Sequence, residues 1–496
     1  MAGGGCVAGV LASPRSIRDL LSADRESLLR LLALATLLGL AAFVLFYRLR
    51  AASWTDDELG YRRAGYEYFN GSFSLNPEHP FLAKYILGAA QLVAGNNDEV
   101  TLRTPAAIAG LLTGVALMLF ASREAGFVAG LITFALWSLI PHAAGFVTPF
   151  RIERFGLLDP FMVAFMSGAL LAGWQWYRSG RWRWALIAGF LAGCAAASKP
   201  PGIFVLPSLL AIAVLKRSRA VAAQASAAVA ACAITAVATY LPVIGTAGHR
   251  IHEMFEFQTS HGGSPILVAG KPYLDPPWWA TLWFHWHNVG PVASVCLVAL
   301  AVVSPFLLDR RLVVYLGTAL TGPFVYLAFV SNKVIEHYYY IYVAPLTLLA
   351  GLSLHALLRR PGWYRIVGAG TLAVLFGVAG KMLVDLGHFD GSGYAPVAKT
   401  LRREGLDRAN VVVIGKAFVL RNYLPRALVG GAPDRRTDAV VVDPRDALRA
   451  QNPEARWLGD PRATALYLHG HRASYRFRVV GGLRLYTKRA HTRLSP

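Results

Sequence analysis

The sequence predicts a polytopic α-helical membrane protein with a small α/β domain at its C-terminal end. The 496 residues are 55% hydrophobic and only 16% charged, with a mean hydropathy of +0.44. This composition is too apolar for an ordinary soluble protein and excludes a disordered chain. Apolar runs close to the ~18 to 20 residues that cross a bilayer recur along residues 1–385. The last 110 or so residues change to a mixed α/β pattern.

Eleven apolar segments are the expected membrane spans. The fifth and sixth are short and are separated only by the Ser-Lys-Pro-Pro-Gly sequence at 198–202, so they could be packed inside the bundle or broken near the membrane surface. The expected spans are residues 31–47, 104–122, 125–141, 157–177, 184–197, 201–215, 220–243, 288–307, 312–330, 337–356 and 364–384.

The distribution of cations predicts the orientation in the cell membrane. With the N-terminus inside, residues such as Arg18, Arg181 and Arg310 all fall on the cytoplasmic side, as the positive-inside rule requires. Arg48 and Arg50 are exceptions, but the reverse orientation would export nearly all the loop cations. We therefore expect residues 1–385 to form the membrane domain, with outer loops 48–103, 142–156 and 244–287, and residues 386–496 to form an extracytoplasmic domain.

The C-terminal residues 386–496 predict the α/β domain by their periodicity. A helix-like stretch at 394–404 is followed by β-rich runs at 411–415 and 439–443 and by alternation over 475–486. No glycine-rich dinucleotide fingerprint follows these strands.

The C-terminal segment is also strongly basic. It has 20 lysine and arginine residues against 9 aspartate and glutamate residues, a charge of +11 within the chain's +21. Two interpretations fit: a face that binds anionic lipid head groups or an acidic acceptor, and a basic surface that is merely solvated. Elsewhere many of the arginines lie in short loops between apolar runs, so we expect no nucleic-acid partner.

Charged residues stand at the predicted outer ends of the spans. Asp56, Asp57 and Glu58 follow the first span directly, and carboxylates next to a bilayer are candidates for function, although a solvated loop start is the alternative. Lys84 follows a proline-stiffened turn in an amphipathic segment, where a lysine can also simply snorkel.

Two further charged positions suggest a phosphate site. Arg154 stands five residues before Asp159 at a membrane boundary; such an arginine can bind a phosphate while the acid orients it or binds a metal, and an ion pair that orders the loop is the alternative. Lys199 lies deep in apolar sequence. An unpaired charge there would cost on the order of 2.5 kcal/mol or more, so an anionic partner is required.

Together these segments resemble the protein O-mannosyltransferase superfamily of membrane glycosyltransferases, whose GT-C fold also includes the lipid A aminoarabinose transferases. The resemblance covers about residues 45 to 350. Phe81 stands where many relatives have a second proline, and Asp56 duplicates the acid, which leaves a one-residue ambiguity. The matching segments are Asp57-Glu58, His79-Pro80 with Leu82-Ala83-Lys84, Arg154 to Leu158-Asp159, Lys199 with Gly202, and Lys333 with His337 and Tyr338.

The resemblance implies a GT-C fold and transfer of a sugar from a polyprenyl-phosphate donor to a protein hydroxyl or a lipid acceptor outside the membrane, with inversion. Such transfer needs a base for the acceptor hydroxyl and cations for the leaving phosphate. We expect Asp57 to be the base, with Asp56 in reserve and Glu58 as a neighbour that orients Asp57 or binds the acceptor.

The remaining expected site residues concern the donor and a metal. Lys84, Arg154 and Lys199 form the predicted phosphate clamp, and Asp159 is expected to hold Arg154 or a cation. Besides the polyprenyl-phosphate sugar donor, a divalent metal is a candidate cofactor, because histidines and Glu78 stand in these loops. Histidines in aromatic loops are, however, more often hydrogen-bonded structural groups than metal ligands. The other residues expected at the site are Lys333 and Tyr338 at the donor, His79 and His337 in support, and Glu78 and His261 as metal ligands.

A lipid or sugar flippase is the alternative function, since a transporter also carries charges within the membrane. Many transporters contain related halves and broken helices, and we see no convincing internal repeat in this sequence. Membrane lipids are expected partners in either case. The donor sugar, the acceptor and the oligomeric state do not follow from the residues.

Overall fold

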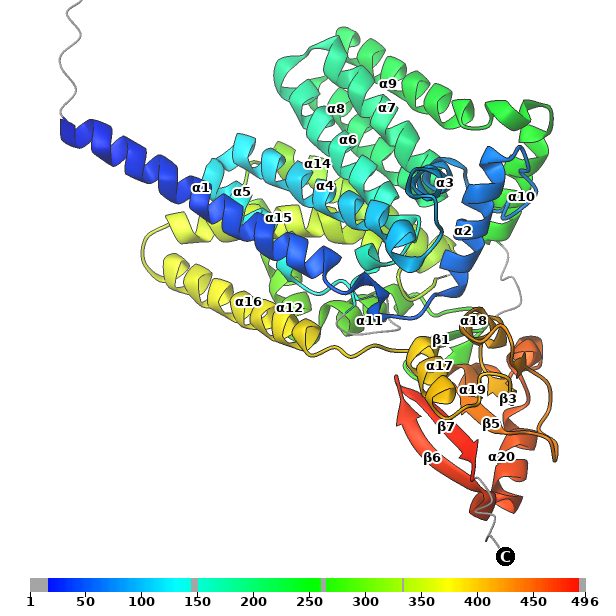
Figure 1. The fold of residues 1–496 in the computed structure, drawn as a ribbon. Coiled ribbons are helices and arrows are strands. Elements are labelled where there is room, and N and C mark those ends of the chain that lie inside the picture. Colours follow the sequence, from blue (N-terminus) through cyan, green and yellow to red (C-terminus); the bar gives the residue numbers. More distant parts are fainter. Residues whose placement is uncertain (1–16, 144–149, 260–264, 332–333, 490–496) are drawn as a thin grey trace, which may run out of the picture.

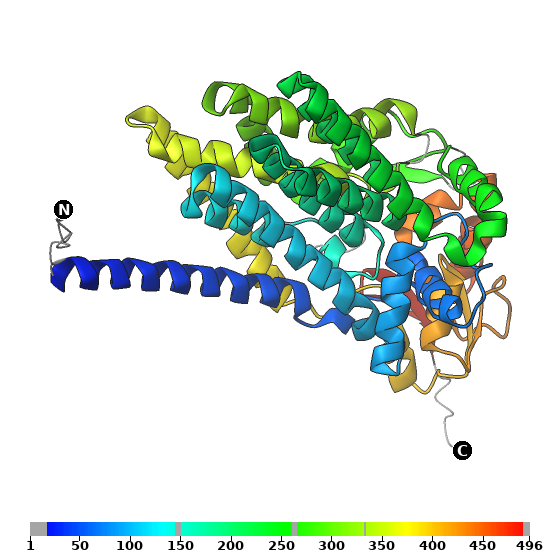
Figure 2. The same cartoon turned by 90° about the horizontal axis from the view of Figure 1, so that it is seen from above.

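A computed structural model describes residues 17–143, 150–259, 265–331 and 334–489 of the protein. Long helices run side by side in a bundle, and the C-terminal domain sits at one end of it (Figure 1). The first helix, α1 (Ile17–Phe46), begins beyond the opposite end of the bundle, so its N-terminal end and the C-terminal domain are far apart (Figure 2).

Each of the eleven predicted spans coincides with helical structure. Six described helices are long and apolar enough to cross a membrane, or seven if the bent pair α11 (Ala280–Val289) and α12 (Pro291–Val302) counts as one span. The predicted polytopic helical fold is therefore confirmed, whereas the number of eleven spans stays a prediction. The other helices of the bundle are α1, α4 (Glu99–Ala125), α5 (Phe127–Leu139), α6 (Asp159–Ser179), α7 (Trp182–Ser198), η3 (Pro200–Val205), α8 (Leu206–Lys216), α9 (Arg219–Ala238), α13 (Ser304–Leu307), α14 (Arg310–Val325), η5 (Tyr326–Val330), α15 (Tyr340–Arg359) and α16 (Trp363–Gly387).

Helix α15 forms the centre of the bundle. Of an apolar stretch of 18 residues in this helix, 89% is buried inside the protein. This is expected for a helix that is apolar on all sides. It packs closely against α5, where a Cβ on Gly351 would lie only 2.3 Å from the Thr133 hydroxyl oxygen. Glycine is needed at this crossing because two helix backbones approach there.

Short elements connect the bundle helices at the end near the C-terminal domain. Helix α2 (Asp56–Phe69) begins with a capping box in which the Thr55 hydroxyl and the Glu58 carboxylate each accept a hydrogen bond from the other residue's backbone N–H. Helix α3 (Leu82–Ala94), which is the predicted amphipathic segment, crosses α2 closely at Gly65 and Gly88. The other elements here are η1 (Leu49–Ala51), η2 (Ile152–Arg154), η4 (Leu241–Thr246), α10 (Ala247–Thr259), β1 (Ile266–Val268) and β2 (Lys271–Tyr273).

The C-terminal domain is built on a five-stranded sheet in the order β4-β3-β5-β7-β6. Strand β3 is parallel to β4 and β5, and the β6–β7 hairpin joins β5 antiparallel through β7. Gly481 and Gly482 form the hairpin turn with positive φ. The predicted α/β domain is confirmed. Its elements are α17 (Tyr394–Arg403), β3 (Asn410–Ile414), α18 (Ala417–Tyr423), β4 (Leu428–Val429), β5 (Ala439–Val442), α19 (Pro444–Arg449), η6 (Pro453–Leu458), α20 (Pro461–Gly470), η7 (Arg472–Ser474), β6 (Tyr475–Val480) and β7 (Leu483–Lys488).

The C-terminal domain is attached to the segment that leads into α2. The Ser53 backbone N–H donates to the Ser392 carbonyl at 3.2 Å, and the Ser392 N–H donates to the Ala51 carbonyl at 3.2 Å. The Trp54 backbone N–H donates to the Tyr423 hydroxyl at 2.8 Å. The residues immediately before Asp56 are therefore held by both domains.

Candidate functional site

Two adjacent carboxylates, Asp56 and Asp57, stand at the N-terminus of α2. The Asp56 Oδ2 atom lies 2.7 Å from the Nζ atom of Lys416, which belongs to the C-terminal domain. No hydrogen bond or ion pair of the Asp57 side chain is found within the part of the chain that the structure describes. Both side chains are half-buried. One carboxylate is thus neutralised by a cation, and its neighbour is available for chemistry.

The surroundings give the two carboxyl groups different acidities. Burial, together with the charge of Asp56, raises the pKa of Asp57 to about 7 against the opposing charges of Lys416 and Lys199. Burial also opposes ionisation of Asp56, but the charge of Lys416 and its hydrogen bond outweigh burial and hold the pKa of Asp56 below its usual range. Asp57 therefore has the pKa of a group that can exchange a proton near neutral pH.

A second cluster is centred on Lys199. Its Nζ atom lies 2.8 and 2.9 Å from the two carboxylate oxygens of Asp159, the first residue of α6. The His337 Nε2 atom lies 3.5 Å from Lys199 Nζ and 3.5 Å from Asp159 Oδ2. The Tyr338 ring covers the ammonium, with its centroid 4.1 Å from Nζ. All four residues are buried, so the anionic partner that Lys199 requires is Asp159.

The two clusters share one electrostatic environment. The charges of Lys199 and Asp159 both act on Asp57, and Tyr61 of α2 is influenced by Asp57 and Asp159 together. The structure thus brings together residues from α2, the start of α6, the end of α7, the segment before α15 and the C-terminal domain. These are six of the residues that the sequence predicts: Asp56, Asp57, Asp159, Lys199, His337 and Tyr338.

A cleft of about 630 Å³ opens beside α2. Asp56 and Arg62 line it from α2, Glu78 from the turn before α3, and Phe418 from α18 of the C-terminal domain. Because the cleft lies between the two domains and includes Asp56, it exposes one of the two carboxylates to a hydrophilic molecule. Asp57 is not among the residues that line it.

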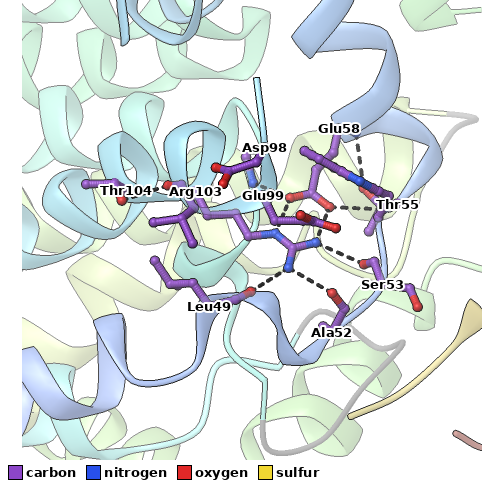
Figure 3. Close-up of polar contacts among 12 residues, drawn as sticks. Leu49, Ala52, Ser53, Thr55, Glu58, Asp98, Glu99, Arg103 and Thr104 are labelled. Atoms are coloured by element: carbon purple, nitrogen blue, oxygen red, sulfur yellow. Dashed lines mark hydrogen bonds and ion pairs between the residues drawn. The ribbon is translucent and has the colours of Figure 1, made fainter. Parts of the chain in front are cut away.

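Glu58 has very different surroundings, although it follows Asp57 directly. Its carboxylate is fully buried and accepts hydrogen bonds from Arg103 Nε at 2.7 Å and Arg103 Nη2 at 2.9 Å (Figure 3). The Gly156 N–H also donates to it, at 2.8 Å. It also closes the capping box with Thr55. The Arg103 guanidinium donates in addition to the carbonyl oxygens of Leu49, Ala52 and Ser53. In this structure Glu58 anchors the segment that carries Asp57.

Two predicted clamp residues are engaged with backbone carbonyls. Lys84 Nζ donates to the carbonyls of Asn76 and His79 at 2.6 and 2.8 Å. Arg154 donates to the carbonyls of Val44 and Tyr47 at the end of α1, and its guanidinium lies 4.0 Å from the Phe150 ring centroid. Burial, with the charges of Arg103 and Arg151, lowers the pKa of Arg154 to about 9. Asp159 holds Lys199, not Arg154.

The described residues do not assemble a metal site. No group of three or more His, Cys, Asp and Glu side chains that could hold a metal occurs in the described part of the chain. Glu78 accepts a hydrogen bond from the Asn76 amide at 2.6 Å, and the buried His79 ring packs on Tyr61 and Phe257. The other predicted ligand, His261, and the predicted donor contact Lys333 lie outside the described residues.

Sequence reasoning missed the contribution of the C-terminal domain. Lys416 follows β3 and Arg449 ends the helix that follows β5, so both stand beyond the carboxyl ends of neighbouring parallel strands. Binding residues commonly occur at that edge of a parallel sheet. This signal was present in the sequence, but strand pairing had to be known before it could be used.

Comparison with known proteins identifies the fold. Residues 78–245, about a third of the chain, match the family described as dolichyl-phosphate-mannose-protein mannosyltransferase. No curated protein matches in sequence.

Solved structures match nearly the whole chain. ArnT from Cupriavidus metallidurans in the apo state has a TM-score of 0.57 at 14% identity, and its undecaprenyl phosphate complex has 0.55 at 15%; both cover 93% of this chain and 98% of ArnT. The Archaeoglobus fulgidus oligosaccharyltransferase tethered with an acceptor peptide has 0.53 at 12%, over 88% and 72%. The resemblance seen in the sequence is confirmed, and the chain has the GT-C fold of these membrane glycosyltransferases.

Proposed function

We propose that the protein transfers a monosaccharide from a polyprenyl-phosphate donor to a hydroxyl or lipid acceptor at the outer face of the membrane, with inversion. The observation that carries the proposal is the half-buried Asp57, which has no hydrogen-bond partner among the described residues and whose pKa is raised to about 7 in the electrostatic field of Asp56, Lys416 and the Lys199–Asp159 pair. ArnT, which has the same fold, was solved bound to undecaprenyl phosphate. A lipid-phosphate donor for this chain is consistent with that structure.

Asp57 serves as the general base. As the acceptor oxygen attacks the anomeric carbon, its proton passes to the Asp57 carboxylate and the bond between that carbon and the phosphate oxygen breaks. The bonding electrons leave with the lipid phosphate. Because one carboxylate acts and no residue bonds to the sugar, a single displacement inverts the anomeric centre.

Lys199 stabilises the leaving phosphate. Its ammonium is held by Asp159 and covered by Tyr338, so it is oriented before the donor arrives. A cation in such a dry site stabilises developing negative charge far more strongly than one in water. His337, which contacts both Lys199 and Asp159, keeps this pair in place. Lys333 and Tyr338 remain the further candidates for contact with the donor.

The acceptor enters through the cleft beside α2. The cleft contains the Asp56 carboxylate and lies between the helical bundle and α18, so an acceptor can bind beside Asp56, the residue before the base, while the donor's tail stays in the bilayer. Trp278, just before α11, and Trp286, within α11, are exposed. They suit either an interfacial aromatic belt or stacking on a sugar ring.

The test is transfer by the purified full-length protein. It should release radiolabelled sugar from a polyprenyl-phosphate donor to acceptor or water, and Asp57→Asn should abolish the release. A flippase would instead move the intact labelled lipid across a liposome membrane and leave the bond to the sugar unbroken in both proteins. Lipid movement without sugar release would therefore replace the proposed function.

The proposed sidedness has its own test. Single cysteines at Ser74 and Gly431 should react with a membrane-impermeant thiol reagent in intact cells, whereas a cysteine at Ser218 should not. Reaction of the Ser218 cysteine alone would reverse the orientation and place the proposed site in the cytoplasm.

A further inference from the structure

Two cations of the C-terminal domain reach the candidate site. Lys416, in the connection between β3 and α18, pairs with Asp56 at 2.7 Å. Arg449, the last residue of α19, lies 3.2 Å from a carboxylate oxygen of Glu336 and 3.2 Å from one of Asp446. Both contacts to the bundle join parts of the chain that are far apart in sequence.

The two ion pairs differ in their exposure to solvent. Arg449 and Glu336 are shielded, with side chains 14% and 6% exposed. In the other pair the Lys416 side chain is 15% exposed and that of Asp56 is 38% exposed. Exposed pairs contribute little because water and salt screen them. A shielded pair leaves an uncompensated charge when one partner is removed, so its geometry is strongly enforced.

The two carboxylates that these cations hold belong to the two halves of the site. Asp56 is the first residue of α2 and immediately precedes Asp57. Glu336 immediately precedes His337, which contacts Lys199 and Asp159. The C-terminal domain therefore contacts the residue before Asp57 through Lys416, and the residue before His337 through Arg449.

We propose that the C-terminal domain is an integral part of the catalytic centre, in which Lys416 positions the Asp56–Asp57 pair and Arg449 positions the segment that carries His337. The inference rests on the proposed function, and it adds two positioning residues from outside the membrane bundle. It also gives Asp56 a role: its pairing with Lys416 leaves Asp57 as the carboxylate that accepts the proton.

The pairing has a measurable consequence for the pH profile. Lys416 favours the ionised form of both acids, so removing its charge should raise the pKa of the pair and move the acidic limb of activity to higher pH. Other charges also face the pair. They are Lys199, Asp159 and Arg449 directly, with Asp446, His337, Tyr61, Tyr338 and Tyr394 in the same surroundings.

The experiment compares full-length variants in the sugar-transfer assay as a function of pH. Lys416→Met should lose roughly tenfold or more in transfer at neutral pH, with the acidic limb shifted upward by about one pH unit. Lys416→Arg should restore most of the activity because it keeps the charge. Lys399→Met is the matched control, since it removes an exposed lysine of the same domain, and it should behave as the wild type.

The double variant Asp56→Asn/Lys416→Met separates positioning from a general effect on folding. It removes both charges of the pair, so no unpaired carboxylate remains, and its activity should exceed that of Lys416→Met alone. Arg449→Met should also lower transfer, with a smaller shift of the limb, because Arg449 acts more weakly on Asp56. If Lys416→Met is too unstable to assay, Lys416→Arg and the double variant still decide the question.

Three outcomes would overturn the inference. The first is that Lys416→Met has the same pH profile of transfer as Lys399→Met. The others are that the double variant is no more active than Lys416→Met, and that the acidic limb of Lys416→Met does not move to higher pH. Failure of the proposed function looks different. If the wild type transfers no sugar, or Asp57→Asn is as active as the wild type, the assignment of the site itself is wrong. If both of those controls behave as expected while the Lys416 variants are normal, only the role of the C-terminal domain is refuted.

Discussion

Asp57 and Glu58 are neighbours in the chain, yet the structure gives them opposite surroundings. Glu58 is fully buried, and its carboxylate receives bonds from Arg103, Gly156 and Thr55. Asp57 is half-buried and has no partner among the described residues, while burial raises its pKa to about 7. A carboxylate with every acceptor position filled stabilises a fold, and one without partners can take a proton.

The same contrast separates the cations. Arg154 and Lys84 donate to backbone carbonyls, which bear no formal charge and cannot be displaced without loosening the chain. Lys199 instead pairs with the Asp159 side chain. Side-chain partners can rearrange around a ligand more readily than main-chain atoms can. Pairing with backbone carbonyls is thus the property that distinguishes supporting charges from those proposed to act on substrate.

The largest expected effect is on catalysis at Asp57. Asp57→Asn should lower sugar transfer by ~10²-fold or more, since loss of a general base typically costs that much. Its melting temperature should stay near that of the wild type because no bond to another side chain is lost. Asp56→Asn is the comparison: it breaks the pairing with Lys416 but keeps the Asp57 carboxylate, so it should retain more activity than Asp57→Asn. If Asp56→Asn is the inactive variant and Asp57→Asn keeps activity within about tenfold, the base is the other acid.

The opposite pattern is expected at Glu58. Glu58→Gln leaves Arg103 buried with a neutral partner, which should destabilise the protein by about 3 to 5 kcal/mol. The measurement is thermal unfolding in detergent, with the exposed Glu454→Gln as control. A stable Glu58→Gln protein that has lost only its acceptor affinity would instead support the predicted contact of Glu58 with acceptor.

A smaller effect distinguishes the cations. Lys199→Ala should weaken binding of the polyprenyl-phosphate donor by roughly tenfold, because a hydrogen bond to a charged group is worth about 1.5 to 3 kcal/mol. Arg154→Ala and Lys84→Ala should chiefly lower the melting temperature. Calorimetric titration with the donor, beside thermal unfolding, tests both. Equal loss of donor affinity in all three variants, at unchanged stability, would restore the three-cation clamp predicted from the sequence.

The pH dependence is the smallest of the expected effects. A general base must be ionised, and the pKa of Asp57 is raised to about 7, so activity should fall as pH falls through neutrality. At pH 6 only about a tenth of the Asp57 carboxylates would be ionised, which predicts roughly tenfold slower transfer than on the alkaline plateau. A profile of kcat/KM between about pH 5 and 9 measures this. A flat acidic limb would contradict the assignment.

Local patterns in the sequence were sufficient for the architecture. Apolar runs of membrane-spanning length predict the helical bundle because the bilayer requires each crossing segment to satisfy its own backbone. The α/β domain followed from the apolar β-rich runs at 411–415 and 439–443 and from the alternation over 475–486. The acids after the first span, Asp159 and Lys199 followed from charged residues at span ends or within apolar sequence, where a buried charge is costly without a partner or a function. His337 followed from the resemblance to the mannosyltransferase superfamily.

Only the tertiary structure decided which of those charges work together. Nothing in the spacing of Asp57 and Glu58 indicates that one is saturated by Arg103, 45 residues further along the chain, while the other is not. Likewise, the pairing of Asp56 with Lys416 depends on how the C-terminal sheet docks on the bundle. Periodicity and composition are local properties of the chain, whereas burial and ion pairing depend on which distant segments meet. The sequence therefore determined the elements and the candidate groups, and the packing of the two domains decided their partners and acidities.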